Sequence, residues 1–146
     1  MKQRARPSAG FTLVELLVVM GITGLVLVVV LNARPKVAAT RVAVTARAVG
    51  TTLQLARAQA MASNTETVFR IDTEKMQFGL PRSMHSLPKG MTVAMTVAEA
   101  ERAANVGSIR FFPDGQSSGG EIALMLDGRS AHIAVNWLTG EPLLNR

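Results

Sequence analysis

An uninterrupted apolar stretch near the amino end constrains this chain more than any other feature. The 21 residues from 11 to 31 are almost all apolar, and at about 1.5 Å per residue a helix of that length spans roughly 31 Å. That distance matches the hydrocarbon core of one bilayer. The sequence therefore predicts a transmembrane helix over residues 11–33, preceded by a short basic segment.

Two residues distinguish this segment from an ordinary secretory signal. Gly10, a small residue that a processing enzyme can recognise, precedes the apolar stretch, whereas the cleavage site of a secretory signal follows it. Cleavage after Gly10 would leave the helix on the mature protein. Glu15 is the only ionisable side chain in the stretch, and a carboxylate at mid-membrane costs about 2.5 to 3.5 kcal/mol on insertion scales. Its expected partner is the new α-amine of Phe11, on the same or a neighbouring chain.

Gly10 followed by Phe11-Thr12-Leu13-Val14-Glu15 resembles the prepilin leader of type IV pilins and type II secretion pseudopilins. The resemblance implies that residues 1–10 are a leader removed by prepilin peptidase, and that the Phe11 amine is then N-methylated. It implies that Phe11 and Glu15 take part in assembly, with Glu15 docking subunits into a filament. It also implies a single-pass protein of the bacterial inner membrane, with its C-terminal domain in the periplasm.

Charge alone does not decide the orientation of this segment. Three cations precede the span and three follow it: Lys2, Arg4 and Arg6, then Arg34, Lys36 and Arg41. A second processing scheme is also open, because Val37-Ala38-Ala39 suits signal peptidase and would release a soluble protein beginning at Thr40. It is the weaker scheme, since the apolar stretch exceeds the 7 to 15 residues of an ordinary signal core.

The basic character of the whole chain belongs partly to the leader. The 146 residues include 16 Lys and Arg and 10 Asp and Glu, so that removing the three leader cations leaves 13 − 10 = +3. Beyond Met91, acidic residues outnumber basic ones, so nucleic-acid binding is not expected. With no cysteine and with His85 and His132 isolated, the sequence offers no metal site, and we expect no cofactor and no small-molecule substrate.

Helical periodicity resumes beyond the apolar stretch. Asn32 and Pro35 predict a bend or break, after which residues 34–64 are predicted to form an amphipathic helix. The stripe that should cover the globular domain consists of Val42, Ala46, Val49, Leu53, Ala56 and Ala60. Val44 and Leu55 lie nearly opposite the apolar stripe of this helix. They are either ordinary exposed residues or residues that contact neighbouring helices in a filament. Three cations form a solvated face or meet acidic groups on adjacent subunits: Arg41, Arg47 and Arg57.

From Thr65 the period changes to that of strands, and residues 65–146 are predicted to form an antiparallel β globular domain. A hairpin is expected over residues 67–80, a loop over 81–90 and a short helical turn over 98–104. Further strands are predicted over residues 92–97, 109–112, 122–126 and 131–137, with Trp137 facing inward and Asp127-Gly128 turning the last hairpin. The fold class is α+β and type IV pilin-like: a long N-terminal helix, half transmembrane and half amphipathic, packed on an antiparallel β-sheet.

One motif favours hydrolase chemistry on paper. Gly115-Gln116-Ser117-Ser118-Gly119 matches G-x-S-x-G, and Asp127 and His132 follow in the order of a hydrolase triad. However, a nucleophile elbow requires a helix after the serine, and a strand is predicted there. His132 is predicted on the polar face of its strand. No catalytic residue is therefore expected, although a periplasmic enzyme released at Ala39 stays a third alternative.

Three turn-rich segments in the second half are informative as a set: residues 109–115, 117–120 and 137–141. Turn geometry explains each of them. Together they resemble the C-terminal signature of GspH-type minor pseudopilins, a family that includes FimT and FimU minor pilins. The resemblance covers nearly the whole chain except residues 84–105.

That second resemblance implies a minor pseudopilin of a type II secretion system. Such a protein would assemble near the tip of the periplasmic pseudopilus with the major pseudopilin and the minor tip subunits, and would help export folded proteins across the outer membrane. The alternative is a FimT/FimU-like minor type IV pilin that serves pilus assembly or DNA uptake.

Overall fold

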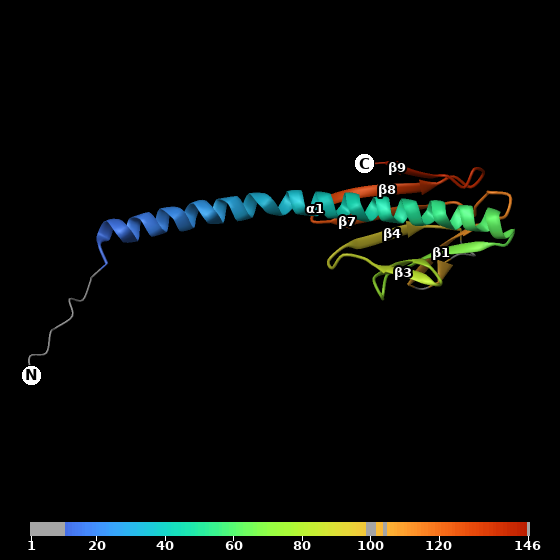
Figure 1. Ribbon diagram of the computed structural model, residues 1–146, viewed down its shortest axis with the longest axis horizontal. Coiled ribbons are helices and arrows are strands. Elements are labelled where there is room, and N and C mark those ends of the chain that lie inside the picture. The colour runs from blue at the N-terminus through green and yellow to red at the C-terminus, as the bar shows by residue number, and fades with distance from the viewer. Residues whose placement is uncertain (1–10, 99–101, 104, 146) are drawn as a thin grey trace, which may run out of the picture. The chain divides into compact units, whose positions relative to one another are not determined.

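The computed structural model describes residues 11–98, 102–103 and 105–145, with backbone alone for 32–36 and 102–103 (Figure 1). Gly10 and the rest of the predicted leader lie outside the described residues. The chain divides into two compact units, Met1–Arg34 and Pro35–Arg146, and each is described by itself.

A single long helix, α1 (Leu13–Ser63), passes through both units. Its first backbone amides are capped by Thr12, whose Oγ1 accepts a hydrogen bond from the Glu15 N–H at 3.2 Å. It ends where Asn64 adopts a left-handed φ of 51° and the Thr65 N–H donates to the Ala60 carbonyl at 3.3 Å, as in a Schellman motif. Of the predicted bend or break at Asn32 and Pro35, the break is wrong, because the helical assignment runs without interruption from Leu13 to Ser63; the bend that an interior proline favours stays a prediction.

The second half of α1 lies along the sheets through the predicted apolar stripe (Figure 1). All six residues of the stripe are buried, and Val49, Leu53, Ala56 and Ala60 have no exposed surface. The three- and four-residue spacing of these side chains forms one continuous face on a helix. The predicted contact between the amphipathic helix and the globular domain is therefore confirmed.

The strands form two antiparallel sheets. The five-stranded sheet has the order β3-β2-β1-β6-β5, and the four-stranded sheet has the order β4-β7-β8-β9. The strands of the first sheet are β1 (Thr67–Asp72), β2 (Gln77–Leu80), β3 (Ser83–Ser86), β5 (Arg102–Ala103) and β6 (Val106–Phe111). Those of the second are β4 (Thr92–Thr96), β7 (Gly120–Leu126), β8 (Arg129–Val135) and β9 (Pro142–Asn145).

The core lies between α1 and the sheets. Its largest fully buried side chains come from α1 and from both sheets: Phe69, Phe111, Leu53, Ile71, Ile109, Ile122, Leu124, Ile133 and Val49. Along β7 and β8 the buried residues alternate with outward ones, as a half-buried strand requires. The predicted α+β fold class, a long helix packed on antiparallel strands, is confirmed.

Both predicted hairpins are present. Ile71 pairs with Phe78 across β1 and β2, and Leu126 pairs with Arg129 at the end of β7 and β8. The turn residues Asp127 and Gly128 have φ values of 48° and 74°, which suit the tight type I′ turn that a two-residue hairpin favours.

Several predicted boundaries are wrong at the edges of the sheets. β3 occupies part of the predicted loop 81–90, and its four residues are all exposed, so it shows no alternation of apolar side chains. β5 replaces part of the helical turn expected over 98–104, of which residues 99–101 and 104 lie outside the described residues. β9 was not predicted. These strands are held by backbone pairing at a sheet edge, which leaves little pattern in the side chains.

Trp137 does not face inward. β8 ends at Val135, two residues before the predicted end of this strand, and the Trp137 side chain is 64% exposed. The alternation that places Ile133 and Val135 in the core does not extend beyond the strand, so it no longer fixes the direction of the indole.

Candidate assembly site

The first part of the candidate site is the apolar segment at the start of α1. Every residue from 11 to 31 is exposed, and none of the span Leu13–Leu31 is buried within the molecule. A core helix of a globular protein would be covered by its own chain. An apolar surface on all sides, long enough to cross a bilayer, is typical of a membrane-spanning helix.

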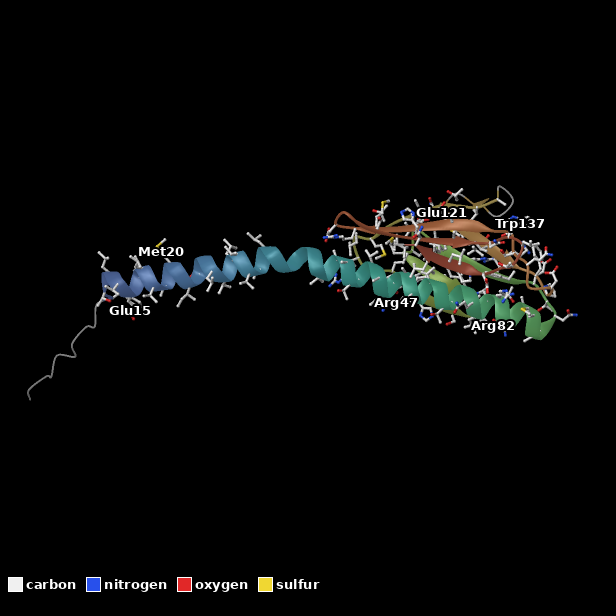
Figure 2. The ribbon with its side chains drawn as sticks, turned by 90° about the horizontal axis from the view of Figure 1, so that it is seen from above. Glu15, Met20, Arg47, Arg82, Glu121 and Trp137 are labelled. Carbon is white, nitrogen blue, oxygen red and sulfur yellow. The ribbon has the colours of Figure 1, made fainter. Side chains whose placement is uncertain are left out.

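Glu15 lies in the first turn of this segment, beside the capping residue (Figure 2). Thr12 and Glu15 stand in the T-x-x-E spacing of a capping box, and a carboxylate at the amino end of a helix interacts favourably with the helix dipole. Among the ion pairs formed by described residues, none includes Glu15. Cleavage after Gly10, methylation of Phe11 and docking by Glu15 stay predictions.

The second part is a cluster of turns held against α1 by Arg57. The Arg57 Nε donates to the Gly115 carbonyl at 3.1 Å. The backbone of Gly140 closes the same cluster, because a Cβ at that position would clash with the Gly115 carbonyl and approach Arg57 Cδ to 3.1 Å. For Arg57, the prediction of a solvated face is wrong: the side chain is half-buried, since position 57 borders the buried stripe.

Ser117 is a structural residue of this cluster. Its side chain is buried, with Oγ donating to the Asn136 carbonyl at 3.1 Å and accepting from the Gly119 N–H at 3.1 Å. The segment that follows is a strand, β7, so the G-x-S-x-G match lacks the helix of a nucleophile elbow.

The other two residues of the apparent triad lie apart from Ser117. Asp127 sits at the end of β7 remote from Gly120. His132 is exposed, as predicted, and its Nδ1 lies 3.5 Å from Glu121 Oε1 on the neighbouring strand. The structure therefore does not bring Ser117, Asp127 and His132 together. Among the described residues there is also no cluster of His, Asp or Glu that could hold a metal ion.

The turn after β8 holds Trp137 outward. Asn136 Oδ1 accepts hydrogen bonds from the N–H groups of Leu138 and Thr139 at 2.8 and 3.2 Å, and the Asn136 carbonyl accepts one from Gly140 at 2.8 Å. This ordered turn exposes Trp137 and Leu138, at 64% and 55%; Figure 2 labels Trp137. Sequence reasoning missed this surface, although an asparagine followed by Thr139-Gly140 is itself a turn signal.

Two family models match different parts of the chain. The family described as Type II transport protein GspH matches residues 45–140. The chain belongs to the GspH family. The prokaryotic N-terminal methylation motif matches residues 5–31, which include Gly10, Phe11 and Glu15. The sequence-based identification of a GspH-type minor pseudopilin is confirmed.

A curated relative agrees with this assignment. Type II secretion system protein H of Xanthomonas campestris pv. campestris is 34% identical over 97 residues, which are 65% of this chain and 57% of that protein. The match thus spans little more than half of that relative's length.

Solved structures of low sequence identity share the fold. The minor pseudopilin EpsH of Vibrio cholerae has a TM-score of 0.57 at 13% identity, and the match covers 72% of this chain and 96% of that one. The type IV minor pilin FimU of Pseudomonas aeruginosa has a TM-score of 0.55 at 13% identity, covering 73% of this chain and 90% of that one. The fold is therefore common to pseudopilins and pilins, and the family match carries the assignment to GspH.

Proposed function

We propose that this minor pseudopilin assembles near the tip of the periplasmic pseudopilus of a type II secretion system and helps export folded proteins across the outer membrane. Its partners are the major pseudopilin and the other minor tip subunits. The observation that carries the proposal is the apolar span Leu13–Leu31, none of which is buried by its own chain, on a chain of the GspH family.

The proposed maturation begins in the bacterial inner membrane. Prepilin peptidase cleaves after Gly10, the new Phe11 amine is methylated, and the globular unit stands in the periplasm. The match of the N-terminal methylation motif to residues 5–31 supports this sequence of events. The domain boundaries proposed for the mature protein are those predicted from the sequence: 11–33, 34–64 and 65–146.

Glu15 supplies the driving force for docking in this scheme. In the hydrocarbon core an unpaired carboxylate is costly, whereas a cationic amine held beside it offsets that cost. Glu15 lies in the capped first turn, four residues after Phe11 in the sequence. A neighbouring subunit whose Phe11 amine meets Glu15 is therefore stabilised in the membrane, and the exposed apolar helices pack together as the filament forms.

The contribution of the globular unit is structural in this proposal, and we assign it no enzymatic activity, cofactor, small molecule or nucleic acid. The bonding of Ser117 supports this assignment, because its hydroxyl is committed to the turn cluster. The ordered exposure of Trp137 and Leu138 suits a surface that contacts another subunit, since aromatic residues are enriched at the centres of interfaces.

A minor type IV pilin is the second candidate function, and the shared fold of FimU favours it. An in-frame deletion of the gene separates the two. We expect the deletion strain to lose extracellular export of its secreted enzymes while surface pili and DNA uptake stay normal, with export restored by the gene on a plasmid. Normal export with impaired piliation or uptake would overturn the secretion role in favour of the pilin.

A further inference from the structure

The outer side of α1 carries a line of exposed apolar residues within the unit Pro35–Arg146. Val37, Val44 and Leu55 are 50%, 58% and 56% exposed. At about 100° per residue, steps of seven and eleven residues return to within roughly 20° of the same direction. The three side chains therefore form a ridge along the helix, nearly opposite the stripe that the sheets bury.

Two arginines border this ridge. Arg41 and Arg47 lie about 60° to either side of Val44 around the helix, and both are exposed; Figure 2 labels Arg47 on α1. Neither takes part in an ion pair among the described residues. We refer to Val37, Arg41, Val44, Arg47 and Leu55 as the stem ridge.

The helix itself supplies no acidic residue to balance these cations. After Glu15, the sequence of α1 contains no Asp or Glu as far as Ser63, whereas it contains several Lys and Arg. A second copy packed stem against stem would thus bring cations against cations, and like charges across an interface are unfavourable. The stem ridge is complementary to a helix that has apolar residues flanked by carboxylates.

We infer that the stem ridge docks an acidic α-helix of a different subunit and disfavours stem-to-stem packing with a second copy of this chain. The inference rests on the proposed role as a filament subunit and specifies its partner's chemistry. From Val37 to Leu55 the ridge extends about 27 Å at 1.5 Å per residue. Exposed Ala48 lies between its apolar members, so a second helix can approach closely, as ridge-into-groove packing requires.

An anionic membrane surface fits these residues less well. A helix that lies in the membrane interface inserts a wide apolar face, but the wide apolar face of this half of α1 is already buried in the core of the globular unit. The ridge that is left is narrow and interrupted by arginines, a pattern that suits contact with one other helix.

Site-specific crosslinking in the native cells tests the inference. The photo-reactive residue p-benzoylphenylalanine replaces Val44 in the full chain, and adducts are identified by the mass of the crosslinked peptide. A second, differently tagged copy of the chain is expressed in the same cells. The test variant adds Arg41→Glu and Arg47→Glu, and the matched control adds Arg82→Glu, an exposed cation between β2 and β3 (Figure 2).

We expect an adduct with a helical segment of another subunit that contains Asp or Glu. The double reversal should lower its yield about five-fold or more, because attraction becomes repulsion at two positions, and Arg82→Glu should leave it unchanged. Replacing the partner's carboxylate residue with lysine should restore the yield of the adduct formed by the chain that carries Arg41→Glu and Arg47→Glu. The tagged second copy should not be captured.

Any of these results would overturn the inference: capture of the second copy, adducts with lipid alone, a partner peptide without acidic residues, or a yield that the double reversal does not lower. Absence of any protein adduct in an exporting strain would overturn it as well. Export in the gene-deletion strain is measured beside these samples. Normal export there contradicts the proposed function, whereas lost export with an insensitive crosslink contradicts only the charge-selective docking.

Discussion

The two halves of α1 use the same kinds of residue for opposite purposes. From Phe11 to Leu31 the apolar side chains point in every direction and all are exposed. Beyond Pro35 the wide apolar stripe is covered by the sheets, completely so at Leu53 and Ala60, while the narrow stem ridge on the opposite side stays exposed. The wide apolar face of the second half is therefore buried within the chain, whereas none of the span Leu13–Leu31 in the first half is buried. One helix thus contains both a half that packs in the core of the globular unit and a half that stays exposed.

Matched leucine substitutions in the two halves should give the largest difference. Leu53→Ala removes a fully buried side chain and should lower the free energy of unfolding by about 2 to 5 kcal/mol. Leu17→Ala, at a residue that is 66% exposed, should leave the unfolding of the globular unit unchanged. Denaturant unfolding of the full chain in detergent, followed by circular dichroism, measures both. Equal destabilisation would show that the first half also packs on the globular unit.

Alanine substitutions of two arginines in the second half of α1 should also change the stability of the globular unit by different amounts. Arg57→Ala removes the donor to the Gly115 carbonyl and should cost about 1 to 2 kcal/mol of stability. Arg47→Ala, at an exposed position, should stay within about 0.5 kcal/mol of the native chain. The same unfolding measurement compares them, and an Arg57→Ala chain of native stability would remove the proposed link between α1 and the turn cluster.

Ser117→Ala tests whether the turn cluster is structural. It removes the hydroxyl that bonds Asn136 and Gly119 and should cost about 1 kcal/mol of stability, while export by the complemented deletion strain persists. A variant that keeps native stability but loses a hydrolase activity of the purified chain would instead support the periplasmic enzyme.

Substitution of Trp137 should have the smallest effect on the free energy of unfolding of the globular unit. Because its side chain is mostly exposed, Trp137→Ala should change the free energy of unfolding by no more than about 0.5 kcal/mol. Trp137 is the only tryptophan of the chain, so its fluorescence can be assigned directly. We expect emission close to that of tryptophan in water, with efficient quenching by acrylamide. A blue-shifted, protected emission would mean that the indole is buried as the strand pattern predicted.

The periodicity of apolar residues predicted those parts of the fold in which the buried positions are occupied by apolar side chains. The stripe from Val42 to Ala60 and the β7–β8 hairpin were predictable, because each buried face repeats at the helical or strand period. β3 and β9 were not, since exposed edge strands rest on backbone pairing. Trp137 was misplaced because nothing in the alternation shows where β8 ends.

The candidate site was predictable to a similar extent. Gly10, Phe11 and Glu15 stand out through their fixed spacing before an apolar span, and the matching methylation motif contains all three. The bond between Arg57 and Gly115 joins positions 58 residues apart. Neither residue carries a local signal for it, so only the folded chain reveals this contact.

Incorporation of a Glu15→Ala variant is the most direct test of the account. The full chain and this variant are compared, with Val14→Ala as the control, by measuring the protein in the membrane fraction and in isolated pseudopili. We expect the same membrane level for all three chains, but strongly reduced incorporation and export for Glu15→Ala alone, because its helix keeps its span and loses the group that neutralises the Phe11 amine. Normal incorporation of Glu15→Ala would contradict docking through Glu15.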